Sequence, residues 1–73
     1  MRKDRWKRLA DEFITKQTVK ILIEYSARIL IKMIDNDFFK FLKLYDIKFE
    51  SKEEEREFKE YFKKEYMKKI GGR

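Results

Sequence analysis

The residues that most often interrupt helices are almost missing from this chain. It contains no proline, and its two glycines stand together at positions 71 and 72. Because Pro and Gly are the strongest local breakers of regular structure, nothing in residues 1–70 forces a helix to end. The sequence therefore predicts an all-α protein. Its 73 residues fit one domain, residues 1–73, with a basic N-terminal end.

The clearest helix is predicted over residues 52–70. Ser51 followed by Glu54 forms a capping box, in which the hydroxyl accepts from a backbone N–H and the carboxylate reaches back. Pairs of Glu and Lys four residues apart, at 55–59, 60–64 and 65–69, support the helix surface, and Gly71 suits its end. The apolar residues recur at helical spacing: Phe58, Tyr61, Phe62, Tyr66 and Ile70.

A second helical stripe begins at Trp6 and continues through Leu9, Ala10, Phe13 and Ile14. Residues 19–34 follow, and their polar positions 20, 24, 28 and 32 recur every four residues along one ridge. We therefore expect a helix over about 4–35, with a break near residue 17 as an open alternative. At 1.5 Å per residue this helix would be ~48 Å long.

Residues 18–25 also alternate between apolar and polar side chains, which is the period of a strand. In that alternative Ser26 caps a following helix, and the order of elements resembles an elaborated ribbon-helix-helix dimer, whose paired strands enter the DNA major groove. The outward residues would then be Lys20, Leu22 and Glu24, a poor set for a phosphate-rich surface. The resemblance covers order and length alone.

The sequence Asp35-Asn36-Asp37 predicts a stop and a restart, with one of the three residues capping a short helix over 37–45. The following residues read as an extended connector with Ile47 and Phe49 against the core. Three to four helices are thus expected in all.

The chain is small enough to need support beyond its core. It has no Cys and no His, which excludes disulfides and argues against a structural zinc site, and we expect no metal or cofactor. The apolar half of the long helix would remain exposed, which predicts a homodimer or a larger protein partner. We expect the protein interface to include Val19, Leu22, Ile23, Leu30 and Met33.

Catalysis is not expected, because a chain without His or Cys has no imidazole base and no thiolate, and we expect no small-molecule substrate. The charges within residues 19–34 argue against a membrane span, and we do not favour binding to a membrane surface. A cytoplasmic protein is expected. The scarcity of Cys, His and side-chain amides, with 47% charged residues, is typical of heat-adapted proteins. AT-rich coding bias, which also favours Lys, Ile, Phe and Tyr, is the open alternative.

Positive charge is concentrated at the two ends. Residues 1–8 carry five basic residues and one acidic residue, and residues 63–73 carry the same numbers. Such clusters favour binding to the phosphate backbone of DNA or RNA. The expected function is a small nucleic-acid-binding protein, such as a regulator or ribonucleoprotein component. The alternative is a helical accessory subunit or inhibitor that docks onto a larger complex such as a polymerase. The candidate nucleic-acid contacts are Arg2, Lys3, Arg5, Trp6, Lys7, Arg8, Lys63, Lys64, Lys68 and Lys69.

Overall fold

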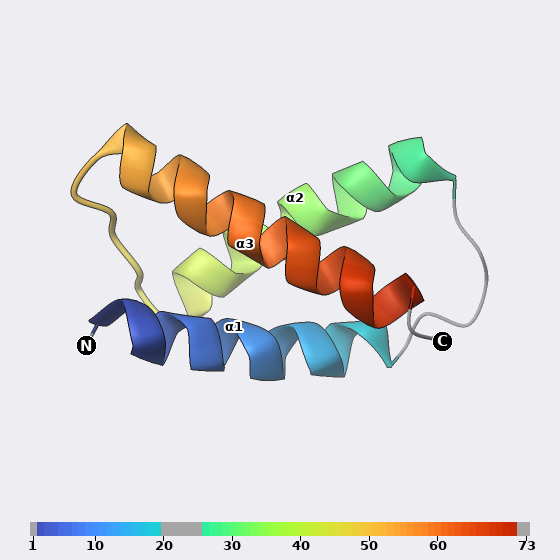
Figure 1. Cartoon of the computed structure of the whole chain (residues 1–73), viewed down its shortest axis with the longest axis horizontal. Helices are drawn as coiled ribbons and strands as arrows, with labels where there is room; N and C mark the ends of the chain where they lie inside the picture. The colour runs from blue at the N-terminus through green and yellow to red at the C-terminus, as the bar shows by residue number, and fades with distance from the viewer. Residues whose placement is uncertain (1, 20–25, 72–73) are drawn as a thin grey trace.

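The computed structural model describes residues 2–19 and 26–71, which form three helices and no strand (Figure 1). Helix α1 spans Arg2–Thr18, α2 spans Ala27–Leu44 and α3 spans Lys52–Gly71. The all-α prediction is therefore confirmed for the described residues. None of these helices is both long enough and apolar enough to cross a membrane.

The prediction of one helix over 4–35 is wrong. Helix α1 ends at Thr18, as the alternative of a break near residue 17 anticipated. A new helix begins after Ser26, whose extended backbone (φ −64°, ψ 158°) makes it the N-cap of α2. Its Oγ accepts a hydrogen bond from the Ile29 N–H at 3.4 Å, which satisfies one of the free donors of the first turn. The choice between strand and helix over residues 20–25 lies outside the described residues.

The predicted stop at Asp35-Asn36-Asp37 is also wrong, and so is a separate helix over 37–45. Helix α2 runs without interruption from Ala27 to Leu44. Both carboxylates are engaged by α3 rather than by a new helix start. The Asp35 Oδ1 lies 3.1 Å from the Lys59 Nζ, and the Tyr66 hydroxyl donates to the Asp37 Oδ2 at 2.6 Å. Tertiary contacts therefore decide the role of residues that locally favour a cap.

The end of α2 is a Schellman motif. The Ile47 N–H donates to the Leu42 carbonyl at 2.9 Å, and the Asp46 N–H donates to the Lys43 carbonyl at 3.4 Å. Asp46 adopts the left-handed conformation (φ 50°) that usually belongs to Gly or Asn at this position. The turn sends Ile47 into the core, as the sequence predicted for the connector.

The capping box of α3 is confirmed. The Glu54 N–H donates to the Ser51 Oγ, and the Glu54 Oε1 accepts from the Glu50 N–H, both at 3.1 Å. Two of the lysines expected to pair along the surface of α3 instead bridge to other helices. Lys59 pairs with Asp35 of α2, and the Lys69 Nζ lies 3.0 Å from the Asp11 Oδ1 of α1.

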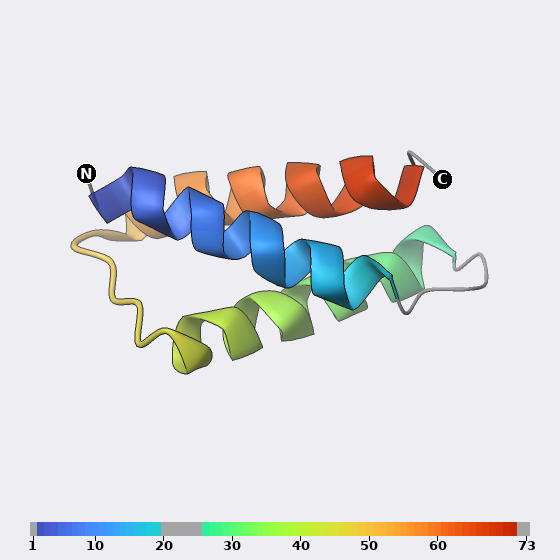
Figure 2. The same cartoon turned by 90° about the horizontal axis from the view of Figure 1, so that it is seen from below.

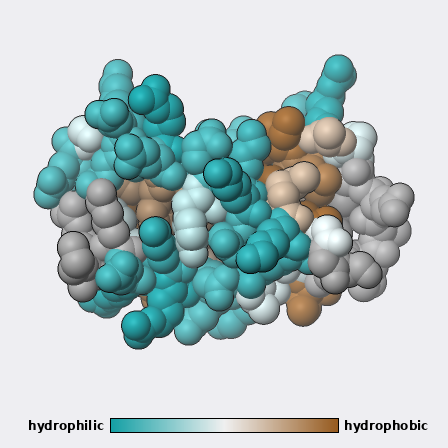
Figure 3. All heavy atoms as spheres, viewed as in Figure 1, coloured by the Kyte–Doolittle hydropathy of each residue, from teal (hydrophilic) through white to brown (hydrophobic). Residues whose placement is uncertain are grey.

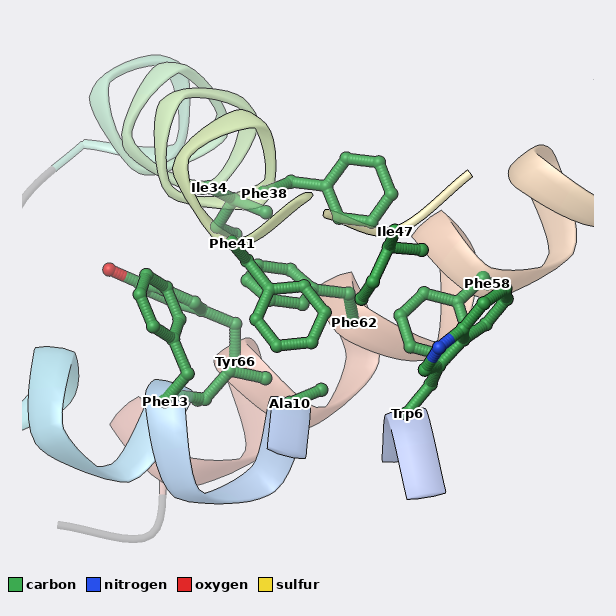
Figure 4. Close-up of a cluster of buried hydrophobic side chains, with 11 residues drawn as sticks. Trp6, Ala10, Phe13, Ile34, Phe38, Phe41, Ile47, Phe58, Phe62 and Tyr66 are labelled. Atoms are coloured by element: carbon green, nitrogen blue, oxygen red, sulfur yellow. The ribbon is translucent and has the colours of Figure 1, made fainter. Parts of the chain in front are cut away.

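Helices α1 and α3 run in the same direction, and α2 runs opposite to both (Figures 1 and 2). Near the start of the two parallel helices, the rings of Trp6 and Phe58 meet edge to face with centroids 5.9 Å apart. Further along, Phe13 lies 6.3 Å from Phe62. The core between the helices consists largely of aromatic rings (Figure 4). Its buried apolar members are Trp6, Ala10, Phe13, Ile14, Ile34, Phe38, Phe41, Ile47, Phe58, Phe62 and Tyr66.

Candidate nucleic-acid interface

The basic cluster predicted at the N-terminal end lies on the first turns of α1. Arg5, Lys7 and Arg8 are exposed, and the Lys7 Nζ lies 5.1 Å from the centre of the Tyr61 ring. Arg2 belongs to the same helix, but the side chains of Arg2 and Lys3 lie outside the described residues.

Trp6 is buried within this cluster. Its indole packs edge to face against Phe49 at 5.4 Å. It packs in the same way against Phe58 at 5.9 Å (Figure 4). A tryptophan held in this way is core, so it is not placed to stack on an unpaired base.

Of the four lysines predicted on α3, three are exposed and one forms an ion pair with α1. Lys63, Lys64 and Lys68 are exposed, whereas Lys69 is half-buried and pairs with Asp11. The parallel packing of α1 and α3 keeps the far end of this cluster away from the first one. Trp6 packs at the level of Phe58, and Lys68 stands ten residues further along α3, or about 15 Å at 1.5 Å per residue. Lys68 is therefore remote from the N-terminal cluster, whereas Lys64 stands one helical turn from Tyr61, whose ring lies beneath Lys7.

The acidic half of α3 lies beside the basic start of α1. Residues 50–62 carry six acidic and three basic residues, and the Trp6–Phe58 contact places this segment next to the first turns of α1. Carboxylates on a neighbouring helix lower the positive electrostatic potential around Arg5 and Arg8, and so weaken their attraction for a phosphate. The N-terminal cluster is thus less favourable than its sequence suggested.

A different basic surface appears on α2, and the sequence analysis missed it. Arg28, Lys32, Asn36 and Lys40 recur every four residues on one continuous helix, and all four are exposed, as is Lys43. We call these five residues the α2 ridge. Each step of four residues rises about 6 Å and turns about 40° around the helix. The ridge therefore forms a gently winding row about 22 Å long.

No carboxylate of α2 lies on this row. The only acidic residues of the helix are Asp35 and Asp37, which bond to Lys59 and Tyr66 of α3. Within the described part of the chain, Arg28, Lys32 and Lys40 form no ion pair, while the Lys43 Nζ lies 4.5 Å from the centre of the Phe39 ring. The α2 ridge is accordingly a row of cations available to an external anion.

The position of α2 in the bundle leaves this row open. In Figure 2, α3 lies along the top of the view and α2 forms the bottom edge, while α1 slopes across the view between them. Its buried residues, Ile34, Asp37, Phe38 and Phe41, face inward. The repeat at 20, 24, 28 and 32 was the signal that could have revealed the ridge. It continues through Asn36 and Lys40, but the expected stop at 35–37 hid this continuation.

Large apolar side chains are also exposed on α2. They are Ile29, Ile31, Phe39 and Leu44, and Phe39 is 58% exposed. Figure 3 shows apolar surface gathered over the start of α2, with hydrophilic surface over most of the same view. Of the predicted protein interface, Val19 is 64% exposed, Leu30 and Met33 are half-buried, and Leu22 and Ile23 lie outside the described residues.

A buried polar pair links α2 to α3 beneath the ridge. Burial of Tyr66, its hydrogen bond to Asp37 and the negative charge of that carboxylate all raise the pKa of the tyrosine hydroxyl far above its usual value. Tyr66 consequently stays protonated and keeps donating to Asp37 throughout the neutral range.

In comparisons with known proteins, no protein-family model, no curated protein and no solved structure matches the chain.

Proposed function

We propose that the protein binds nucleic acid through the phosphate backbone, with the α2 ridge as the main contact surface. The observation that carries the proposal is the row of four exposed cations on one helix, Arg28, Lys32, Lys40 and Lys43, while the two acidic residues of that helix bond to Lys59 and Tyr66 of α3. The positive charges of such a row complement the negative charges of a line of phosphates. The exposed Arg5 and Arg8 of α1 would add a secondary contact.

Salt dependence tests this proposal. Each phosphate neutralised by a cation contributes about −0.9 to the slope of log affinity against log salt for duplex DNA, so four contacts give a slope of about −4. Fluorescence polarisation should be measured with labelled duplex DNA, single-stranded DNA and an RNA hairpin between roughly 50 and 200 mM salt. We expect salt-sensitive binding to at least one of these polymers.

Matched charge reversals locate the surface. Lys32→Glu with Lys40→Glu should lower affinity ~10-fold or more and make the slope shallower by about 2, because two phosphate contacts are lost. Arg5→Glu with Arg8→Glu changes the net charge equally and should have the smaller effect. A larger loss from the α1 pair would contradict the role of α2. Absence of binding by the unaltered protein at low salt would refute the function itself.

A second candidate function is favoured by the exposed apolar residues of α2. Ile29, Phe39 and Leu44 could insert into an apolar groove of a larger protein, making this chain an accessory subunit. The charge of the ridge selects an acidic partner.

The two functions differ in their dependence on salt and on apolar side chains. Docking predicts that no polymer binds at low salt and that the isolated chain self-associates through its exposed apolar surface. Light scattering should then show a mass that falls in the variant Phe39→Ser with Leu44→Ser. A monomer that binds nucleic acid would instead favour the first function.

A further inference from the structure

We infer that α2 lies in the major groove of duplex DNA and that Asn36 reads an adenine there. This inference rests on the proposed function and names its substrate. Asn36 is the one uncharged member of the α2 ridge. It is exposed, and its amide has no hydrogen-bond partner among the described residues. Cations stand on both sides of it along the helix, so phosphate contacts would hold the amide in a fixed register.

The positions of the ridge residues around the helix axis fit a groove bordered by two phosphate backbones. Three steps of four residues place Lys40 about 120° around the helix from Arg28. Lys32, Asn36 and Lys43 fall within that arc. When Arg28 and Lys40 contact the phosphates of opposite strands, Asn36 faces the floor of the groove, where the base edges lie.

The dimensions favour duplex DNA over other nucleic acids. The major groove of B-form DNA is about 12 Å wide and admits an α-helix of about 10–12 Å diameter. In duplex RNA the corresponding groove is too deep and narrow for side chains to read. Single strands are usually held by a series of exposed aromatic rings. On the described face of α2, Phe39 is the one ring beside the ridge, and Lys43 already lies over it.

The hydrogen-bonding groups of Asn36 favour A·T pairs at the base edges of the major groove. An asparagine amide forms two hydrogen bonds with the N6 and N7 atoms of adenine, a pairing that other bases do not offer in the major groove. The exposed side chain of Ile29 lies on the same side of the helix two turns before Asn36, and it can contact a thymine methyl group. Asn36 is therefore proposed as the specificity-determining residue, and the four cations supply affinity without sequence preference.

Three duplexes of equal length test the inference by fluorescence polarisation. One contains A·T pairs, one contains G·C pairs, and the third is the A·T duplex with 7-deazaadenine, which lacks the N7 atom but keeps every phosphate. We expect the A·T duplex to bind about 5- to 150-fold more tightly than the G·C duplex, the discrimination of one bidentate contact. The 7-deazaadenine duplex should lose most of this advantage, because N7 lies in the major groove.

The variant Asn36→Ala should lose the A·T preference while still binding the G·C duplex with unchanged salt dependence. Gln17→Ala removes the other side-chain amide of the chain, which stands on α1, and should leave the preference intact. Equal binding to all three duplexes, or a preference that survives either Asn36→Ala or 7-deazaadenine, would overturn the role of Asn36. Tighter binding to an RNA hairpin would overturn the choice of DNA. Failure to bind any polymer would instead refute the proposed function.

Discussion

Replacing Phe62 with alanine should lower the free energy of unfolding by about 3–5 kcal/mol, the usual cost of removing a buried phenyl ring. Phe62 is fully buried, and its ring contacts those of Phe13, Phe38 and Phe41 from the other two helices. The cavity would therefore open where all three helices meet. A domain of this size is stable by roughly 4–11 kcal/mol, so much of the total would be lost.

Urea denaturation followed by circular dichroism measures this effect. Phe39→Ala is the matched control, since it deletes the same ring from a side chain that is 58% exposed. Its cost should stay within about 0.5 kcal/mol. Similar losses from the two variants would show that the aromatic core does not hold the helices together as described.

Replacing Tyr66 with phenylalanine should cost about 1–3 kcal/mol at neutral pH. The ring that fills the core is kept, but the buried Asp37 carboxylate loses its hydrogen-bond donor. Urea denaturation again supplies the measurement, and Tyr45→Phe is the control because Tyr45 is exposed. An unchanged free energy of unfolding in Tyr66→Phe would mean that the Asp37 bond contributes nothing to stability.

The same pair determines how stability changes at high pH. The pKa of Tyr66 in the folded protein is raised above its unfolded value of 10.0, first by burial and then by Asp37. The stability that this shift contributes is therefore present below about pH 10, and it is lost as pH rises toward the folded-state pKa. Unfolding free energies above pH 10 should fall less steeply in Tyr66→Phe than in the unaltered protein. The pKa of Tyr61 is also raised, by burial and by the charges of Glu65 and Asp11. The free energy of unfolding of Tyr66→Phe should therefore still decline above pH 10, but by less.

The helices were predictable where local signals and packing agree. The capping box at Ser51 and the apolar spacing after it placed α3 within one residue of its observed end. At Asp35 and Asp37 the local signal favoured a stop, but contacts with Lys59 and Tyr66 use both carboxylates and the helix continues. Those partners lie 24 and 29 residues away along the chain, so spacing along the sequence could not reveal them.

The candidate site was harder to predict for the same reason. Charge counted by segment emphasised the two ends and averaged residues 9–49 to a net charge near zero. The average hid the fact that the two carboxylates of α2 bond to α3 and leave the cations of the helix without an ion pair among the described residues. The parallel arrangement of α1 and α3, which places Lys68 far from the basic start of α1, also depends on contacts that composition does not show.

The central claim is that α2 is the surface that meets nucleic acid. It is tested most directly by titrating ¹⁵N-labelled protein with a short duplex and following the backbone amide signals by NMR. We expect the largest shifts between Arg28 and Lys43, smaller shifts around Arg5 and Arg8, and little change on α3. Shifts concentrated at Lys63, Lys64 and Lys68, or no shifts at low salt, would contradict the claim.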